Sequence, residues 1–261
     1  MSDGAHRFGM PGYTAHTYGD AFADVYDDWY ADLADDDFVQ TVIDRLPAAP
    51  ARILDLGTGT GRLLERVSAA RSNDELIGID SSEAMLAIAR RRPSLAAARL
   101  ECADFSVALP DGPFDVVMAG YNTLFNLPDD AALASCLRLV AGTLSAAGAL
   151  VVDCVMPPRD GGGDHVGIRS ITADEVVLSV SRHDPATGRI VGQFVHIGAT
   201  SAGAPTGSSG VRLRPWSVRY VAPERLDEIA AAQGLQIESR RGDGENGAPA
   251  TRHVSVYSRA H

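Results

Sequence analysis

Three glycines on alternate positions follow a short apolar run in the first half of the chain. The segment ILDLGTGTGR, residues 53–62, places Gly57, Gly59 and Gly61 directly after a run that contains Asp55. A short apolar run of this kind is typical of a buried parallel strand. Glycine lets the backbone turn sharply and come close to a bound molecule. The segment therefore predicts a cofactor-binding turn.

Two further carboxylates end the next two strand-like segments. Asp80 closes the run LIGID, and Asp104, in ECADF, is followed by Phe105. In open α/β sheets ligands bind at the carboxyl ends of the strands, and an acid at the second strand end is the usual partner of ribose hydroxyls. A carboxylate beside an aromatic ring can accept a hydrogen bond from an exocyclic amine while the ring stacks on a purine. The spacing predicts a nucleoside site.

The glycine spacing separates two classes of cofactor. A dinucleotide fingerprint needs G-x-G-x-x-G, and its third glycine would fall at Arg62, whose side chain would obstruct packing of helix on strand. Gly61 comes one residue too early for that motif. A ribose-binding acid fits either class, so a nicotinamide-dependent oxidoreductase remains an alternative.

Together, the turn glycines and the three acids resemble the nucleoside-binding set of class I S-adenosylmethionine (SAM) methyltransferases. The resemblance implies that the glycines approach the methionine end of SAM, that Asp80 binds both ribose hydroxyls, and that Asp104 and Phe105 hold the adenine with Met85 on its face. It assigns to cofactor binding Tyr18, Tyr26, Tyr30, Asp55, Gly57, Thr58, Gly59, Gly61, Asp80, Ser81, Met85, Asp104, Phe105, Ala119, Gly120 and Tyr121.

Two other segments bear on the methyl acceptor. The YDxxY pattern of Tyr26 and Tyr30 resembles the N-terminal helix of small-molecule N-methyltransferases that modify amino sugars in antibiotic pathways. Electron-rich rings attract a sulfonium, although these rings could instead fill a helix–sheet interface. In the loop GYNTLFNL, residues 120–127, the resemblance places Tyr121 and Asn122 above the cofactor, although Asn is also suited to turns. Asn126 stands where the sugar enzymes carry His or Tyr. The candidate catalytic residues are Tyr26, Tyr121, Asn122 and Asn126.

Several aromatic and basic residues are further candidates for contact with the acceptor, although each is also explicable as a packing or surface residue. They are Tyr13, Tyr18, His165, Trp216, Arg219 and Tyr220.

The predicted function is methyl transfer from SAM to an amine of a small molecule or short peptide, with S-adenosylhomocysteine as product. In-line displacement mainly requires alignment of the two reactants, and burial alone helps an amine to lose its proton. No strong base is evident in these motifs. The alternatives are O-methylation of a small molecule, a NAD-dependent oxidoreductase, and a SAM-binding protein without turnover.

The predicted fold is α/β, with a doubly wound, mostly parallel seven-stranded sheet and an inserted antiparallel sheet. Alternating strands and helices predict the parallel part, and β-type alternation after a change of pattern predicts the insertion. The last two strands are expected to pair as an antiparallel hairpin. The parallel strands are predicted at 52–56, 75–80, 97–102, 114–119 and 148–155, the inserted strands at 176–183, 189–197 and 211–220, and the hairpin at 235–240 and 252–258.

The chain divides into three parts. Residues 1–50 are predicted to form N-terminal lid helices, with residues 1–17 mobile and one helix running from Asp20 to Leu33. The SAM-binding domain is predicted at 51–156 and 222–261, and the antiparallel insertion that covers the acceptor site at 157–221.

Composition excludes several partners. A net charge of -11 disfavours a nucleic-acid ligand, which normally requires clustered basic residues. No apolar run approaches the length of a membrane span, and no targeting signal is apparent, so the expected location is the cytoplasm. The histidines and cysteines lack metal-ligand spacing, which predicts no metal. The inserted sheet is a possible homodimer interface.

Overall fold

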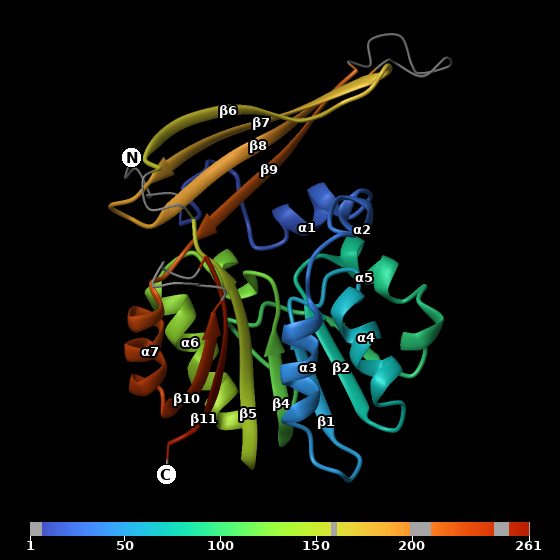
Figure 1. Ribbon diagram of the computed structural model, residues 1–261, viewed down its shortest axis with the longest axis vertical. Helices are drawn as coiled ribbons and strands as arrows, with labels where there is room; N and C mark the ends of the chain where they lie inside the picture. Colours follow the sequence, from blue (N-terminus) through green and yellow to red (C-terminus); the bar gives the residue numbers. More distant parts are fainter. Residues whose placement is uncertain (1–6, 158–160, 199–209, 243–250, 261) are drawn as a thin grey trace.

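Two sheets organise the computed structural model, which describes residues 7–157, 161–198, 210–242 and 251–260. Sheet A has seven strands in the order β10-β11-β5-β4-β1-β2-β3, and sheet B has four strands in the order β6-β7-β8-β9. Figure 1 shows sheet B set off from the α/β part, with helices α1 and α2 lying between the two. The predicted fold class is confirmed.

Sheet A is parallel from β3 to β5 and ends in an antiparallel hairpin. β11 runs antiparallel to both β5 and β10, as predicted for the last two strands. Side chains of β1 alternate between the two faces, and both faces are buried, which explains its continuous apolar sequence. The strands are β1 (Arg52–Leu56), β2 (Glu75–Asp80), β3 (Arg99–Cys102), β4 (Phe114–Ala119), β5 (Leu144–Val155), β10 (Leu235–Gly242) and β11 (Arg252–Arg259).

Helices pack on both faces of sheet A. Apolar side chains of α6 and α7 share one buried cluster with β1 and β2, and those of α3 and α4 share a second cluster on the other face. The helices are α1 (Thr17–Phe22), α2 (Tyr26–Trp29), α3 (Asp36–Asp44), α4 (Arg62–Ala70), α5 (Glu83–Ala89), α6 (Asp130–Thr143) and α7 (Pro223–Ala232), with 3₁₀ turns η1 (Pro93–Leu95) and η2 (Thr123–Asn126). None of the helices in the described ranges is long and apolar enough to cross a bilayer.

Sheet B contains one strand that the sequence pattern did not reveal. Its strands are β6 (Gly163–Ile171), β7 (Glu175–Asp184), β8 (Arg189–Gly198) and β9 (Val211–Arg219). β6 is not among the three strands that were predicted for the insertion. It is an edge strand whose side chains are mostly exposed. Val166 and Ile168 alternate with less apolar residues, but this run is short and follows a glycine-rich stretch. Pro215 lies on β9, the other edge of the sheet, which suits a residue that has no amide hydrogen to donate.

The expected helix from Asp20 to Leu33 is broken into α1 and α2. In a continuous helix the carbonyl of Ala21 would accept from the amide of Val25. The buried guanidinium of Arg214, on β9, instead donates to that carbonyl. It also donates to the two carboxylate oxygens of Asp24, at 2.6 and 3.0 Å. The Val25 amide donates to the carbonyl of Phe22. The break therefore results from a contact with sheet B, which lies far away in the sequence.

Candidate functional site

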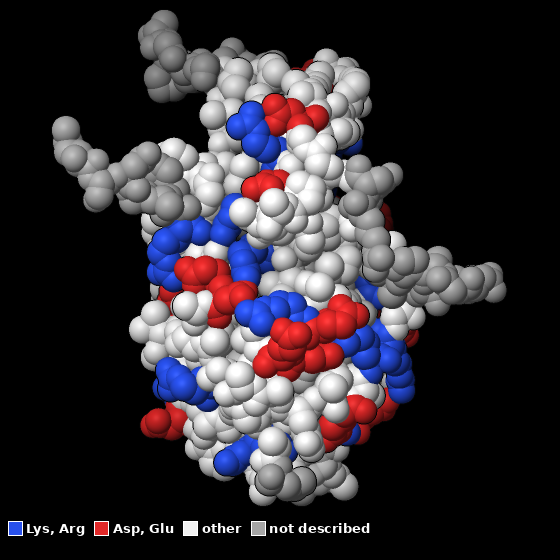
Figure 2. All heavy atoms as spheres, turned by 90° about the vertical axis from the view of Figure 1, so that its left-hand side faces the viewer, with Lys and Arg blue, Asp and Glu red and all other residues white. Residues whose placement is uncertain are grey.

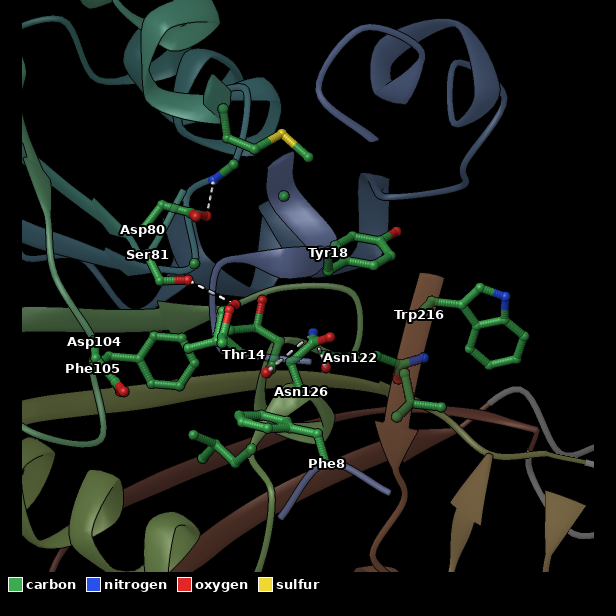
Figure 3. A pocket seen from close by; sticks show the side chains of 18 of the residues that line it. Phe8, Thr14, Tyr18, Asp80, Ser81, Asp104, Phe105, Asn122, Asn126 and Trp216 are labelled. Carbon is green, nitrogen blue, oxygen red and sulfur yellow. Dashed lines mark hydrogen bonds between the residues drawn. The ribbon is translucent and has the colours of Figure 1, made fainter. Parts of the chain in front are cut away.

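A cavity of about 510 Å³ is lined by residues at the carboxyl ends of the sheet A strands and by Phe194, Trp216 and Val218 of sheet B. Figure 3 shows Asp80, Asp104 and Phe105 at one end and Trp216, from β9, at the opposite end, with Tyr18 between them. The cavity therefore joins the predicted nucleoside site to the N-terminal segment and to the insertion.

The structure brings most of the predicted site residues to this cavity. Those that line it are Tyr18, Tyr26, Tyr30, Gly57, Gly59, Asp80, Ser81, Met85, Asp104, Phe105, Tyr121, Asn122 and Asn126. Those that do not line it are Asp55, Thr58, Gly61, Ala119 and Gly120. The latter group lies behind the wall of the cavity, where Thr58 Oγ1 donates to Asp55 Oδ2 at 2.8 Å and Gly120 packs against Leu63.

The three turn glycines have different neighbours, although all have positive φ, at +61°, +57° and +78°. A Cβ on Gly57 would lie 2.8 Å from Thr123, and one on Gly61 would lie 2.5 Å from Leu95. A Cβ on Gly59 would meet only the carbonyl oxygen of Gly57, at 3.9 Å. Gly61 therefore serves the packing of α4, whereas Gly59 leaves open space that belongs to the cavity.

Two of the three predicted acids face the cavity. Asp80 accepts hydrogen bonds from the amides of Gly59 and Ser82 at 2.9 and 2.8 Å. Burial raises the pKa of Asp80, and the hydrogen bonds from these amides partly offset the shift. Asp104 Oδ1 accepts from the amide and hydroxyl of Ser106 at 2.8 and 2.6 Å. Two carboxylates held in this way present acceptors to a ligand with hydroxyl and amine donors.

Asp55 lies apart from these two acids because its side chain points into the core. It is only 2% exposed, and burial raises its pKa to about 7 despite the bond from Thr58. Asp80 adds to the shift through like-charge repulsion. Asp55 therefore supports the turn from behind and does not contact the cavity.

Four tyrosines form a cluster at the centre of the cavity. The ring centroids of Tyr26 and Tyr30 lie 4.8 Å apart, those of Tyr30 and Tyr121 lie 5.6 Å apart, and the hydroxyls of Tyr18 and Tyr30 are 3.2 Å apart. Burial raises the pKa of Tyr18, Tyr26 and Tyr121. These phenols therefore stay neutral near pH 7, so their rings can attract a cation but their hydroxyls cannot serve as strong bases.

The turn after β4, which we call the acceptor turn (residues 121–126), is hydrogen-bonded to the end of β5. Tyr121 and Asn122 have φ of +40° and +62°, a left-handed conformation that is uncommon outside glycine. Asn122 Oδ1 accepts from the amide of Val155 at 2.6 Å, and Asn126 Nδ2 donates to the carbonyl of Asn122 at 3.3 Å. The side chains of both asparagines thus help to fix the turn.

Sequence reasoning missed part of the N-terminal segment. Residues 7–17 were predicted to be mobile, but Phe8, Tyr13 and Thr14 line the cavity. The hydroxyl of Ser217 donates to the carbonyl of Phe8 at 2.5 Å, and the amide of Ser217 donates to the Tyr13 hydroxyl at 3.3 Å. Burial raises the pKa of Tyr13 to about 12. These contacts come from sheet B, far away in the sequence, and leave no periodic signal in residues 7–17.

The other candidate acceptor contacts separate into two groups. Trp216 lines the cavity, as Tyr13 and Tyr18 do. His165 is exposed on β6, Arg219 pairs with Asp130, and the Tyr220 hydroxyl lies 2.9 Å from His183 Nε2, so these three lie outside the lining. Within the described ranges, no cluster of three or more His, Cys, Asp or Glu residues is arranged to hold a metal.

The central part of the chain matches a known protein family. Residues 53–143 match a family described as a methyltransferase domain. A demethylmenaquinone methyltransferase of Thermus thermophilus is 36% identical over 119 residues, which cover 44% of this chain and 52% of that protein. The match thus spans about half the length of this curated relative.

Solved structures match over nearly the whole chain. The CcbJ methyltransferase from Streptomyces caelestis is 30% identical, with a TM-score of 0.82, over 95% of this chain and 100% of that one. The sugar N-methyltransferase KedS8 from Streptoalloteichus sp. shares the fold at 24% identity and a TM-score of 0.69, over 97% of this chain and 99% of that one.

Proposed function

Because this chain belongs to the class I SAM-dependent methyltransferases, with SAM as its cofactor, we propose that it methylates an amine of a small molecule or short peptide. Transfer would proceed by in-line displacement, in which the acceptor nitrogen attacks the methyl carbon and S-adenosylhomocysteine leaves. We place the acceptor in a natural-product pathway, on the resemblance of the YDxxY segment.

For the cofactor we propose one end of the cavity, which we call the cofactor side: Gly57, Gly59, Asp80, Ser81, Met85, Asp104, Phe105 and Ser106. Asp80 would accept from the ribose hydroxyls, and Asp104 would accept from the adenine amine. Phe105 and Met85 would pack on the adenine. The amide-bound carboxylate of Asp80 and the open space at Gly59 support this assignment.

We propose that the acceptor binds at the other end, the acceptor side: Arg7, Phe8, Tyr13, Asn126, Leu127, Pro128, Phe194, Trp216 and Val218. Most of these side chains are apolar or aromatic, and none is a carboxylate. Such a lining favours a molecule with an apolar part and disfavours a charged ammonium. The methyl group would point between the two sides, at Tyr18, Tyr26, Tyr30 and Tyr121, whose rings would face the sulfonium.

The absence of a base near the tyrosine cluster is the observation that carries the choice of nitrogen. Among the described residues that line the cavity there is no His, Cys, Lys or Glu, and Asp80 and Asp104 lie on the cofactor side. The tyrosines whose pKa is raised are poor proton acceptors near neutral pH. A hydroxyl acceptor needs a base, whereas a neutral amine attacks unaided. An amine is therefore favoured over oxygen.

Two statements about partners remain proposals. We propose that nucleic acid is not a partner, on the net charge of -11; on the face shown in Figure 2, basic side chains lie beside acidic ones. For a homodimer, the supporting feature is the outer face of sheet B, where Val166, Ile168 and Leu213 are 67%, 66% and 56% exposed. Sedimentation velocity should show a dimer, and Ile168→Glu should shift it towards monomer.

The experiment that tests the function uses SAM with a ¹³C-labelled methyl group and a panel of small amines, amino sugars and short peptides. Mass spectrometry and NMR should find the label as N–CH₃ in the product. An O–CH₃ product would contradict the choice of nitrogen. Stabilisation by NAD but not by S-adenosylhomocysteine in a thermal-shift assay would contradict the cofactor. Binding of SAM with no transfer to any acceptor would favour a silent SAM-binding protein.

A further inference from the structure

A row of four alternating charges lies behind the wall of the cavity; we call it the four-charge chain: Arg62, Asp35, Arg252 and Asp153. Arg62 donates to Asp35 Oδ2, and Arg252 Nη2 lies 3.3 Å from Asp35 Oδ1. Arg252 also donates two hydrogen bonds to Asp153, from Nε to Oδ1 at 2.9 Å and from Nη2 to Oδ2 at 2.7 Å. Both carboxylates are 1% exposed. Buried charges of this kind persist only when each is paired.

One end of the four-charge chain holds the acceptor turn. The Tyr121 amide donates to Asp153 Oδ2 at 3.2 Å, and the Asn122 amide donates to the carbonyl of Asp153 at 3.0 Å. These two residues are the described non-glycine positions with positive φ. A strained conformation of this kind persists only where the surrounding contacts over-determine it. Asp153 therefore holds the start of the acceptor turn twice, through its carboxylate and through its backbone carbonyl.

The other end of the four-charge chain reaches the glycine turn between β1 and α4, residues 57–61, which we call the cofactor turn. Arg62 is the first residue of α4, directly after Gly61. Asp35 lies between α2 and α3, at the exit from the segment that carries the tyrosine cluster. Arg252 is the first residue of β11, and Asp153 lies on β5. Four elements that are distant in sequence thus meet through these charges, and none of the four residues lines the cavity.

We infer that the four-charge chain positions the acceptor turn and links its order to the cofactor turn, so that Tyr121 and Asn122 stand at a fixed place relative to the bound cofactor. This inference rests on the proposed function, because methyl transfer is what requires the two turns at a fixed separation. Displacement tolerates little misplacement of the reacting atoms, so a rigid link between the turns contributes to alignment. Asp35, Arg252 and Asp153 are positioning residues, since they act through the turn.

The test compares Arg252→Gln with the unaltered protein, using S-adenosylhomocysteine as the probe. Amide hydrogen exchange of a peptide that covers residues 119–126 is measured with and without the probe, and calorimetry gives its affinity. In the unaltered protein the probe should slow exchange in this peptide. In Arg252→Gln the exchange should be about tenfold faster or more and no longer slowed by the probe, while affinity changes less than about threefold, because the lost contacts lie outside the cavity.

Two further variants keep the test decisive. Arg252→Lys preserves the charge but not the paired geometry, so its exchange rate should lie between those of the unaltered protein and Arg252→Gln. It replaces Arg252→Gln in the test if that variant does not fold. Arg240→Gln removes another Arg–Asp pair, with Asp227 at 2.6 and 3.0 Å, from the neighbouring strand. It should leave exchange in residues 119–126 unchanged.

Unchanged exchange in both Arg252 variants would overturn the inference, and so would equal acceleration in Arg240→Gln. Failure of the unaltered protein to bind S-adenosylhomocysteine would contradict the proposed function instead, because the four-charge chain could still hold the acceptor turn without any ligand. The two failures are therefore distinguishable.

Discussion

The cofactor side and the acceptor side of the cavity are assembled differently. The cofactor side comes from residues 57–106, where successive strands of one parallel sheet deliver their ends to the same edge. The acceptor side comes from three distant stretches, within 7–15, 126–128 and 194–218. Local contacts hold the cofactor side, since Asp80 accepts hydrogen bonds from amides of the glycine turn and of the start of the next helix. Long-range contacts hold the acceptor side.

This difference predicts how each side responds to substitution. A change on the cofactor side should alter the affinity for S-adenosylhomocysteine directly. A change on the acceptor side should leave that affinity nearly intact and act on methyl transfer. Sheet B and the N-terminal segment can therefore vary to fit new acceptors while the cofactor site stays the same, as loops do on other rigid scaffolds.

The largest effect is expected for Gly59→Val. Its side chain would enter the space between the turn and the cofactor, so affinity for S-adenosylhomocysteine should fall at least about 1000-fold, or about 4 kcal/mol. Calorimetry measures the loss. Gly234→Val is the matched control, because Gly234 also has a positive φ, +81°, with open space around it, but does not line the cavity. If the affinity for S-adenosylhomocysteine falls equally in Gly59→Val and Gly234→Val, backbone strain and not occupied space explains the loss.

Asp55→Asn should separate stability from binding within the cofactor side. The folded pKa of Asp55, about 7, exceeds the ordinary value of 3.8. The folded state therefore binds this proton more tightly, and the group costs stability as pH rises from about 4 to 7, by up to about 4 kcal/mol. Asn cannot ionise, so the variant should be more stable than the unaltered protein at pH 8.

Urea unfolding at pH 5 and pH 8 measures this difference, which should grow with pH. Affinity for S-adenosylhomocysteine should change less than about threefold, because a hydrogen bond from Thr58 survives and no cavity contact is lost. A variant that is less stable at pH 8 would show that the Asp55 carboxylate is stabilising.

Asp80→Asn, the same substitution on a neighbouring strand, should act on binding. One amide oxygen replaces two carboxylate oxygens that now accept from Gly59 and Ser82, and the amide group would face one of these donors. Affinity for S-adenosylhomocysteine should fall about 10- to 100-fold, or about 1.4 to 2.7 kcal/mol. Calorimetry at pH 8 measures it. In the unaltered protein, affinity should also weaken at acid pH, as protonation of Asp80 removes an acceptor. Equal affinities of Asp55→Asn and Asp80→Asn would remove the distinction between the two acids.

Sequence could predict the cofactor side because strand ends, glycine spacing and acids are local signals. The spans of β1, β2 and β4 were predicted to the residue, and Asp80 and Asp104 do line the cavity. The same local signals could not tell that Asp55 points into the core, because that depends on the strand's orientation towards its neighbours. They placed Asp55 and Asp80 in one set, although only Asp80 reaches the cavity.

The acceptor side was only partly predictable for a related reason. Tyr13 and Trp216 were recognised as candidates because they lie in the predicted lid and in the predicted insertion. The order of residues 7–17 was not, because Ser217 and Arg214 of β9 supply the contacts that fix this segment and α1. β6 escaped prediction because its short alternation of Val166 and Ile168 follows a glycine-rich stretch and forms no buried face. Nor does any spacing reveal the four-charge chain, whose members come from four elements.

The smallest effect on the cofactor is expected for Trp216→Leu. The indole lines the cavity at the end opposite Asp80 and Asp104 (Figure 3), so affinity for S-adenosylhomocysteine should change less than about twofold, or about 0.4 kcal/mol. Methyl transfer to an acceptor found in the labelled-SAM panel should fall because a large apolar contact is lost. Leu213→Ala is the control on the same strand, where Leu213 is 56% exposed on the outer face, and it should alter neither quantity. A fall in cofactor affinity with Trp216→Leu as large as that with Asp80→Asn would show that the cofactor extends to sheet B and that the two sides are one site.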